Sequence, residues 1–531
     1  MPENPSGVSG AAKTGLERKP QVRTALLLTA AFFIIGLVGI LRHEIWRDEM
    51  QAWLVSKDTV SLDRLWTVAL HQKHPVTWYL ALKGVSLLSS SPVAMQILHL
   101  AIATLSAFLL FAYAPFKIYQ KIFLGFGYYF LYEYALISRN YGLGVLSLFA
   151  FCALFPRFRR KPLPAAACLF LLANTSVYGL ILAGAAGGVL LVEVLAGEEL
   201  RRKPKFWVAL LIIGLGLALC LYQLKPLPTS GYERATPFHT TFNSGLLVDV
   251  LILVPRAFLP LPLPILNFWN HPALDHLPAA RTVEVLLCLA ILAASIALLR
   301  RSRPALLFFL LSGAVFFLWF YVGYIGFTRH YGHLFIAFVA ALWMAGAAPG
   351  RPAASPPVRA GISGSRFLRA GLSVVLFSHF LAGVFAYAMD FSHQFSQARN
   401  TARYIRRKGF DGLPIVAHMQ GPCVPVAGYL NRPLHYVSQG GLGTFSFSAS
   451  RRPWGVTVED VLADAERLCR LHKKDCLIIL SLPLLEKAAP DRKNLIRLGR
   501  TPPAIVAGEE YFFYLLKFRE SASAAFDSSV R

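Results

Sequence analysis

The sequence has few charged residues and still fewer acidic ones. Of 531 residues only 15% are charged, whereas soluble chains carry about 25%. Against 53 Lys and Arg stand 28 Asp and Glu, the hydrophobic content is 55%, and the mean hydropathy is +0.51. The chain also has repeated apolar runs of about 18 to 22 residues, the length that crosses a bilayer. These features exclude a soluble protein and indicate a multi-spanning membrane protein.

Other features are missing as well. No Cys/His set has the spacing of a zinc site, and no internal repeat is visible. The first apolar run ends in charged residues rather than a small-residue cleavage site, so we expect it to stay as a span. Of the seven cysteines, Cys423, Cys469 and Cys476 fall in the C-terminal part, which allows one disulfide, such as Cys469–Cys476.

The net charge of +25 comes from short basic clusters between the apolar runs, as in membrane-flanking loops, and does not indicate a nucleic-acid partner. If the N-terminus is cytoplasmic and eleven runs cross, every basic cluster lies inside, as the positive-inside rule requires. Residues 74–91 must then lie at the outer interface, because a span there would reverse every later loop. The eleven expected spans are 24–41, 93–113, 118–137, 141–156, 163–177, 178–196, 206–224, 281–299, 304–322, 331–347 and 367–388.

The C-terminal part has a different pattern. "GLPIVAHM" and "DCLIILSL" predict short buried strands, and "TVEDVLADAERLCRLHKK" predicts a helix with acidic residues first and basic residues last. The predicted fold class is therefore mostly α, a polytopic membrane helical bundle of about 11 transmembrane helices with a small C-terminal α/β extracytoplasmic domain. The predicted parts are a membrane module (1–390, with a first outer loop 42–92 and a long outer loop 225–280), an α/β domain (391–520) and a flexible tail (521–531).

Unusual polar residues collect in the expected outer segments. The stretch "HEIWRDEMQAW" places Asp48 and Glu49 side by side between Trp46 and Trp53, which we interpret as interface anchors. His74-Pro75 closes the same loop.

Two arginines occupy similar positions at the outer ends of spans. Arg139 lies in "SRNYG" and Arg329-His330 lies in "TRHYG", so each begins an Arg-x-Tyr-Gly string. Charge at the membrane boundary is costly unless it reaches water or forms a site, and the guanidinium fork suits phosphate. The pair predicts an anion site.

Two further groups carry charge or metal-binding atoms. Glu133 lies within an expected span, where a carboxylate is usually paired or functional. His271, Asp275 and His276 could bind a metal by composition, but a loop that covers the site or the lipid entrance explains this Pro-rich segment better.

An acidic pair after the first span, followed by His-Pro before an interfacial helix, resembles the integral-membrane GT-C glycosyltransferases, such as protein O-mannosyltransferases and aminoarabinose transferases. "SRNYGL" is similar to their second outer loop. Val76 departs from the second proline that often follows in the family.

The resemblance implies inverting transfer of a sugar, hexosyl or pentosyl, from a polyprenyl-phosphate donor on the outer, periplasmic face. Asp48 would be the general base, and Glu49 would either raise the pKa of Asp48 or hold the acceptor or a metal. The other implied roles are phosphate binding by Arg139 and Arg329, support by His330 and Tyr141, and a sugar pocket lined by His74.

The implied partners are the lipid-linked donor, membrane lipids, and a lipid, glycan or protein acceptor. These residues identify no particular cofactor, and a divalent cation (Mg²⁺ or Mn²⁺) is left open. A bacterial inner membrane fits the short basic loops better than an endoplasmic-reticulum membrane. The alternatives are a transporter or lipid flippase, which should show inverted repeats, and a non-catalytic membrane scaffold, which leaves the acidic pair and arginines unexplained.

Overall fold

A computed structural model shows a mostly helical chain with one small sheet, and it describes residues 18–225, 238–347, 365–446, 455–484 and 494–519. The chain divides into two compact units, and each is described by itself. Within the described ranges, the helical unit comprises residues 18–42, 73–225, 238–347 and 365–392, and the α/β unit comprises residues 43–72, 393–446, 455–484 and 494–519.

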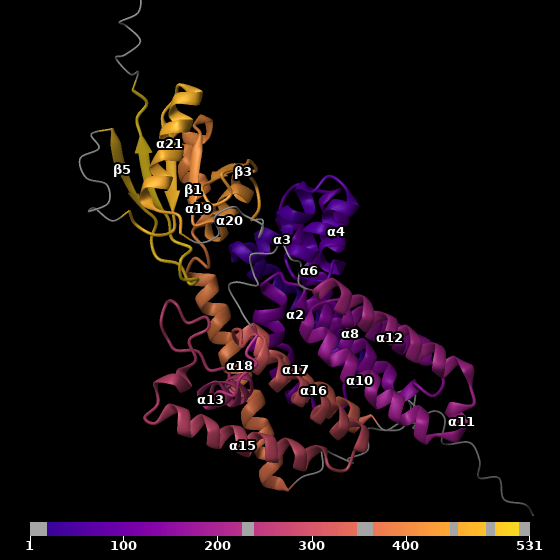
Figure 1. Ribbon diagram of the computed structural model, residues 1–531. Helices are drawn as coiled ribbons and strands as arrows, with labels where there is room; N and C mark the ends of the chain where they lie inside the picture. The colour runs from indigo at the N-terminus through magenta and orange to yellow at the C-terminus, as the bar shows by residue number, and fades with distance from the viewer. Residues whose placement is uncertain (1–17, 226–237, 348–364, 447–454, 485–493, 520–531) are drawn as a thin grey trace, which may run out of the picture. The chain divides into compact units, whose positions relative to one another are not determined.

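The helical unit contains the long apolar helices. Seven helices in the described part of the chain are long and apolar enough to cross a membrane, which confirms the membrane character predicted from the sequence. They are α2 (Arg18–Arg42), α6 (Val93–Tyr113), α10 (Val177–Ala196), α12 (Pro204–Leu224), α15 (Ala280–Leu299), α16 (Arg303–Val322) and α18 (Arg366–Ser392) (Figure 1).

Four of the eleven expected spans fall outside this group, and three of these four take shorter or more irregular forms. Segment 118–137 is divided into α7 (Ile118–Gly125) and the π-helix η1 (Tyr128–Leu136). Segments 141–156 and 163–177 become α8 (Tyr141–Leu154), with 14 residues, and α9 (Pro162–Ala173), with 12. Segment 331–347 lies in α17 (Thr328–Gly346), which is buried from Thr328 to Met344. These four are not among the seven long apolar helices.

Short elements connect the helices. In the expected interfacial segment, α5 (Thr77–Ser86) has 10 residues, about 15 Å, which is half of the hydrocarbon thickness. The remaining short elements of the helical unit are η2 (Phe155–Arg157), α11 (Glu198–Arg201), α13 (Ser244–Leu251), α14 (Leu253–Phe258) and η4 (Ala273–His276).

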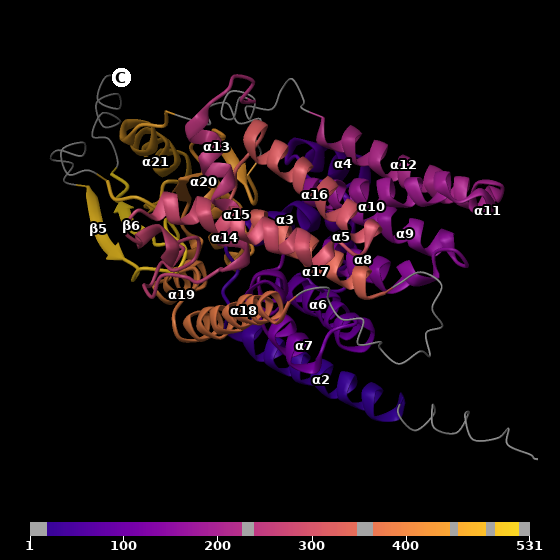
Figure 2. The same ribbon diagram turned by 90° about the horizontal axis from the view of Figure 1, so that it is seen from below.

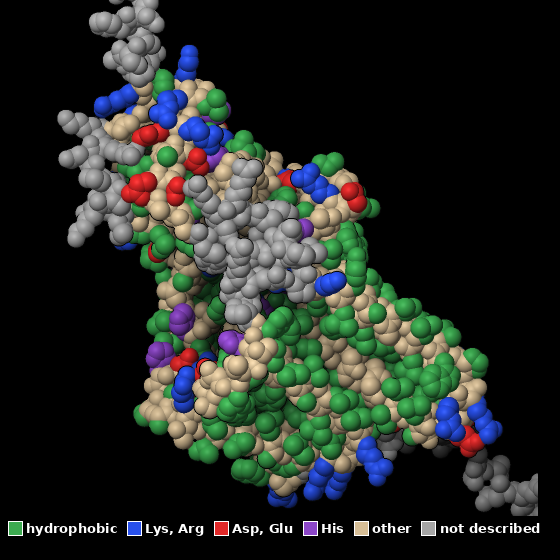
Figure 3. Space-filling model, viewed as in Figure 1, with side chains coloured by type: hydrophobic (Ala, Val, Ile, Leu, Met, Phe, Trp, Pro, Cys, Tyr) green, Lys and Arg blue, Asp and Glu red, His purple; other side chains and the backbone are tan. Residues whose placement is uncertain are grey.

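Packing inside the helical unit places α9 against α8, α10 and α12, and α17 against α14 and α16 (Figure 2). On the face shown in Figure 3, hydrophobic side chains cover most of this unit, and Lys and Arg side chains gather at its margins, for example around α11. An apolar surface of this kind is what lipid-facing helices present.

The α/β unit is built on a six-stranded sheet with the order β3-β2-β1-β4-β6-β5. β1 pairs in parallel with β2 and β4, and the other neighbours are antiparallel. The strands are β1 (Ile415–His418), β2 (Leu434–Tyr436), β3 (Gly441–Gly443), β4 (Cys476–Leu480), β5 (Leu495–Arg500) and β6 (Phe512–Leu516). Its helices are α3 (Arg47–Asp58), α4 (Leu62–His71), α19 (Ala398–Arg407), α20 (Gln420–Leu430) and α21 (Val458–His472), with the short η5 (Phe410–Gly412).

The predicted strands and helix of the C-terminal part are confirmed as β1, β4 and α21. β4 and β6 are buried along their whole length, as central strands covered on both faces are. Thr457 caps α21 by accepting from the Asp460 N–H, and Lys473 ends the helix with φ of 48°. All seven cysteines are free, so the Cys469–Cys476 disulfide is not formed in this structure. The expected tail 521–531 lies outside the described residues.

The first-loop residues 43–72 are built into the α/β unit. α3 packs on α20, where Gly428 faces Met50 and a Cβ at Gly428 would collide with the Met50 side chain. The Ile45 N–H donates to the Tyr429 hydroxyl at 2.9 Å. The Gln51 amide exchanges two hydrogen bonds with the Ser446 backbone, at 2.6 and 2.8 Å. This segment therefore takes its local structure from residues nearly 400 positions later.

Candidate functional site

The helical unit brings the two predicted arginines into one buried cluster. Arg139 lies in the turn between η1 and α8, and Arg329 lies in the first turn of α17. The two side chains are 8% and 7% exposed. The charges of both arginines act on Glu133 and on His330. Two guanidinium groups 190 positions apart thus share one site.

Glu133 is the acidic member of this cluster. It projects from η1 and is 1% exposed, and its Oε2 accepts a hydrogen bond from Trp269 Nε1 at 3.0 Å. The guanidinium carbon of Arg329 lies 5.2 Å from the centre of the Trp269 ring, within cation–π range. Trp269 is not among the predicted site residues, because nothing in its local sequence indicates a partner 136 positions earlier.

Aromatic and histidine rings surround the arginines. Tyr141 lies with its ring centre 5.7 Å from the Arg139 guanidinium and 5.9 Å from the His330 ring. Tyr178 stacks on His330 at 5.4 Å and on His333 at 4.7 Å. His333 follows His330 by three positions on one helix, and this spacing is the sequence signal that could have found it.

The backbone at the start of α17 is fixed by the same residues. His330 Nδ1 accepts from the Phe327 N–H at 2.9 Å. The Tyr134 hydroxyl of η1 donates to the Arg329 carbonyl at 2.8 Å. Since both contacts fix backbone atoms, Arg329 extends from a constrained turn rather than from a loose loop.

His74 joins the cluster through the loop before α5. It lies close enough to His330 for an electrostatic interaction between the two side chains. The next residues of that loop are fixed by a side chain of α12. The Val76 N–H donates to Gln223 Oε1 at 2.8 Å, and Gln223 Nε2 donates to Asn174 Oδ1 at 2.9 Å. The neighbouring Thr175 carbonyl accepts from Asn140 at 2.6 Å. One polar chain therefore supports both the His74 loop and the Arg139 turn.

The electrostatic character of the cluster follows from its members. Two guanidinium groups and one carboxyl group lie together inside an apolar helical unit. Buried charge is stabilised by a counter-ion, and guanidinium groups match the oxygens of a phosphate or carboxylate. The two guanidinium groups can therefore bind an anion such as a phosphodiester.

The predicted acidic pair belongs to the α/β unit, where its two carboxylates have different surroundings. Glu49 is fully buried, lies 3.1 Å from His43 Nε2, and accepts from the Trp46 N–H at 3.3 Å. It caps the N-terminus of α3. Asp48 is only half-buried. Of the two, Asp48 is the carboxylate that solvent reaches.

The tryptophans around this pair correct one expectation. The sequence pattern favours Trp46 and Trp53 as interface anchors, but they are 3% and 1% exposed and form part of the protein core. Trp46 packs edge-on against Phe395, with ring centres 6.3 Å apart. The reason is that residues 43–58 fold against the C-terminal domain and not as an isolated loop.

Five of the seven predicted site residues thus meet in the helical unit: His74, Arg139, Tyr141, Arg329 and His330. Asp48 and Glu49 are placed in the α/β unit. No protein-family model, curated protein or solved structure matches the chain. Functional inference therefore depends on these two groups of residues.

The weaker metal hypothesis gains no support within the described ranges. No group of three or more His, Cys, Asp or Glu side chains there could hold a metal ion. His271 Nδ1 contacts the Asn267 carbonyl at 2.5 Å, and Asp275 pairs with Arg256 at 2.7 Å. These side chains serve the local structure of the loop.

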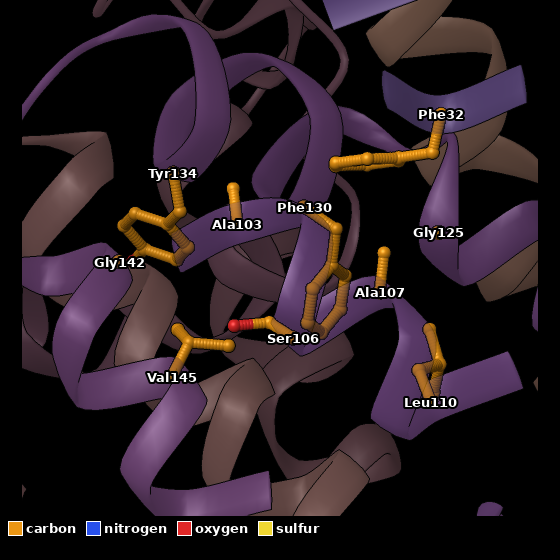
Figure 4. A pocket seen from close by; sticks show the side chains of 10 residues that line it. All are labelled: Phe32, Ala103, Ser106, Ala107, Leu110, Gly125, Phe130, Tyr134, Gly142 and Val145. Atoms are coloured by element: carbon orange, nitrogen blue, oxygen red, sulfur yellow. The ribbon is translucent and has the colours of Figure 1, made fainter. Parts of the chain in front are cut away.

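A small cavity lies beside the cluster, between α2, α6, η1 and α8 (Figure 4). Its space of about 10 Å³ is close to the minimum for one water molecule. Apart from Ser106 and Tyr134 its lining is apolar, and the Ser106 hydroxyl donates to the Ile102 carbonyl within its own helix. The cavity is a packing space and not a substrate pocket. Its lining is Phe32, Ala103, Ser106, Ala107, Leu110, Gly125, Phe130, Tyr134, Gly142 and Val145.

Proposed function

We propose that this chain is a membrane glycosyltransferase of the GT-C type that uses a polyprenyl-phosphate-linked sugar. The acceptor, a lipid, glycan or protein, would be modified on the outer face of a bacterial inner membrane. The N-terminus would be cytoplasmic and the α/β unit periplasmic. The basic clusters of the sequence support this orientation through the positive-inside rule.

The observation that carries the proposal is the buried arginine pair. Arg139 and Arg329 come from distant segments, are both buried, and both act on Glu133 and His330. Two guanidinium groups gathered at one buried site match the oxygens of a phosphodiester, which supports an anionic ligand there.

In the proposed reaction the acceptor hydroxyl or amide attacks the anomeric carbon of the sugar. The acceptor proton passes to the Asp48 carboxylate as the new glycosidic bond forms. The bond between the anomeric carbon and the phosphate oxygen breaks, and the electron pair stays on the lipid phosphate. Arg139 and Arg329 stabilise the charge that develops there. Attack from the face opposite to the phosphate inverts the anomeric configuration.

The different surroundings of the two adjacent carboxylates support Asp48 as the base. Glu49 already holds His43 and the Trp46 N–H, so it is committed to local structure. Asp48 is half-buried and lies one residue into α3. Glu49 then serves as the group that orients the first turn of α3.

The test uses the purified full chain in lipid nanodiscs with a panel of short-chain polyprenyl-phosphate hexoses and pentoses. Asp48→Asn should retain donor binding and lose about 10²- to 10⁴-fold in turnover, the usual contribution of a general base. Arg139→Gln and Arg329→Gln should each weaken donor binding about tenfold or more, because each removes a charge-assisted contact.

Asp63→Asn, on the exposed face of α4, and Arg300→Gln, at the exposed end of α15, are matched controls that should leave both quantities unchanged. If the wild-type chain binds no donor of the panel, the transferase proposal is wrong. If it binds donor and moves the lipid between leaflets without transferring sugar, the arginine pair serves a flippase.

A further inference from the structure

The N-terminus of α3 is held by Glu509, a residue of the segment that leads into β6. The Arg47 N–H donates to Glu509 Oε1 at 2.9 Å, and Arg47 Nε lies 3.3 Å from the same oxygen. Arg47 also donates through Nη2 to the Ala507 carbonyl at 3.2 Å. Glu509 is fully buried, whereas about a third of the Arg47 side chain is exposed. All of these residues belong to the α/β unit.

The Glu509 segment is itself anchored on both sides. The Gln397 N–H, at the start of α19, donates to the Glu509 carbonyl at 3.1 Å. Tyr511 donates through its hydroxyl to the Pro422 carbonyl at 2.6 Å, and its N–H donates to Thr501 Oγ1 at 2.9 Å. The carboxylate is thus presented to α3 by a segment fixed to α20 and to the sheet.

Two carboxylates therefore occupy the first turn of α3. Glu49 takes the Trp46 N–H from within the helix, and Glu509 takes the Arg47 N–H from 462 positions away. Negative charge at a helix N-terminus is stabilised by the helix dipole. Asp48 is the next residue, so its backbone position depends on both contacts.

We propose that Glu509 is a positioning residue of the transferase site, which fixes the first turn of α3 and with it the orientation of Asp48. This inference rests on the proposed function, because it assigns to Asp48 the role of base. It adds a role for the α/β unit, which would orient the reactive carboxylate in addition to carrying it.

The charged and titratable groups around Glu509 make this contact sensitive to pH. They are Arg47 and Asp48 from α3, Tyr511 from its own segment, and Cys423 from α20. Burial raises the pKa of Glu509 to about 7, although Arg47 and the Ser396 hydroxyl act against the rise. Protonation in this range removes the negative charge that Arg47 contacts.

The raised pKa also has a consequence for stability. A carboxyl group whose pKa is higher in the folded chain stabilises the fold most below its ordinary pKa near 4.5, and that contribution is lost as pH rises through about 7. Ionised Glu509 therefore costs stability at pH 8. A residue with a purely structural task would not be expected to carry this cost.

The experiment compares Glu509→Gln with Glu510→Gln, its half-buried neighbour, in the full chain in nanodiscs, with a short-chain polyprenyl-phosphate hexose as donor. Glu509→Gln should lower kcat about tenfold or more while KM for the donor is unchanged, because a misplaced catalytic group slows the chemical step and not binding. The wild-type rate should fall below about pH 7, and this inflection should be absent in Glu509→Gln. As pH rises from 5 to 8, the Tm of Glu509→Gln should increase relative to the Tm of the wild type.

Backbone hydrogen exchange separates this inference from the proposed function, because it needs no turnover. Exchange at Arg47 and Asp48 should accelerate in Glu509→Gln and stay at the wild-type rate in Glu510→Gln. If wild type transfers no sugar but exchange responds as stated, the transferase proposal fails and the contact itself is supported. If exchange is unchanged, or Glu510→Gln has the same effect on kcat, the positioning role of Glu509 is overturned.

Discussion

At the scale of single residues, Asp48 and Glu49 show how neighbours with similar chemistry acquire different tasks. Their side chains leave α3 in different directions, so Glu49 is buried against His43 while Asp48 keeps access to solvent. The sequence identifies both carboxylates as site candidates but does not separate them. The separation depends on His43 and on the fold of the α/β unit.

The first residue-scale prediction concerns stability. Glu49→Gln should lower the free energy of unfolding by about 1–3 kcal/mol, because it removes the buried charged partner of His43 and a charged cap of α3. Asp48→Asn should change it by less than about 0.5 kcal/mol, as substitutions at solvent-accessible sites usually do. The check is thermal unfolding of the α/β unit within the full chain, monitored by tryptophan fluorescence. Equal destabilisation by the two variants would contradict the assignment of Glu49 as the cap.

Residue positions are predictable where composition makes them conspicuous. Arginine at the edge of an apolar run is costly, and that cost alone marks Arg139 and Arg329 in the sequence. Trp269 and Glu509 carry no such mark, because tryptophan is common near membranes and a Glu before a strand is ordinary. Their roles arise from partners far away in the sequence, Glu133 and Arg47.

At the scale of elements, the π-helix η1 is the feature that most determines the cluster. It carries Glu133 and Tyr134 and leads directly into the Arg139 turn. π-helical turns are rare and often occur at functional sites. The apolar pattern of 118–137 predicts one continuous span, since hydropathy does not reveal a change of hydrogen-bonding period.

Close packing between η1 and α18 leads to a prediction at this scale. A Cβ on Gly383 would lie 2.8 Å from the backbone of Phe126, Gly127 and Tyr128 at the start of η1. Backbone cannot move aside as a flexible side chain can, so Gly383→Ala should displace α18 or η1 and destabilise the chain by about 1–3 kcal/mol. Donor binding should weaken as well, because Glu133 lies in η1 and the Arg139 turn comes directly after η1, so a displaced η1 would displace both.

Gly371 provides the matched control in the same helix, since nothing lies within 4 Å of a Cβ placed there. Gly371→Ala should leave stability unchanged or raise it slightly, as expected for Ala in a helix. The two variants are compared by thermal unfolding in nanodiscs and by donor affinity. A stable, fully binding Gly383→Ala variant would show that the approach of α18 to η1 is not constrained as described.

Elements are predictable in proportion to their length and regularity. The long apolar helices and the strands β1 and β4 follow from periodicity, and so does α21 with its charge pattern. The short helices α8 and α9 are recognisable as apolar segments, but their ends are not. Their lengths are set by turns such as the one at Asn174, whose side-chain amide donates to the Phe170 carbonyl in α9 and to the distant Gly216 carbonyl.

At the scale of the whole molecule, the division of the chain does not follow sequence order. Residues 43–72 fold with the C-terminal segment, so the α/β unit is assembled from parts on both sides of the helical unit. Contiguity along the sequence instead favours placing the first loop with the membrane module. The contacts of Ile45 and Gln51 with Tyr429 and Ser446 cannot be read from contiguity.

Membrane orientation gives the last prediction. The basic turn before α16 is expected on the cytoplasmic face and the α/β unit on the outer face. Arg301→Cys and Leu442→Cys place exposed thiols in these two regions. In intact cells a membrane-impermeant maleimide should label Leu442→Cys, and it should label Arg301→Cys only after permeabilisation. The wild-type chain is the control, since six of its seven cysteines are buried and Cys168 is partly buried.

This labelling also decides whether α17 crosses the membrane. Between the two positions the chain passes through α16, α17 and α18. Three crossings put the two thiols on opposite faces, whereas two crossings put them on the same face. Labelling of both thiols from one side would mean that α17 does not cross. The number of crossings would then no longer place Arg329, at the start of α17, at the outer membrane boundary. Labelling from opposite sides would support three crossings, with the start of α17, where Arg329 lies, on the same outer face as the α/β unit.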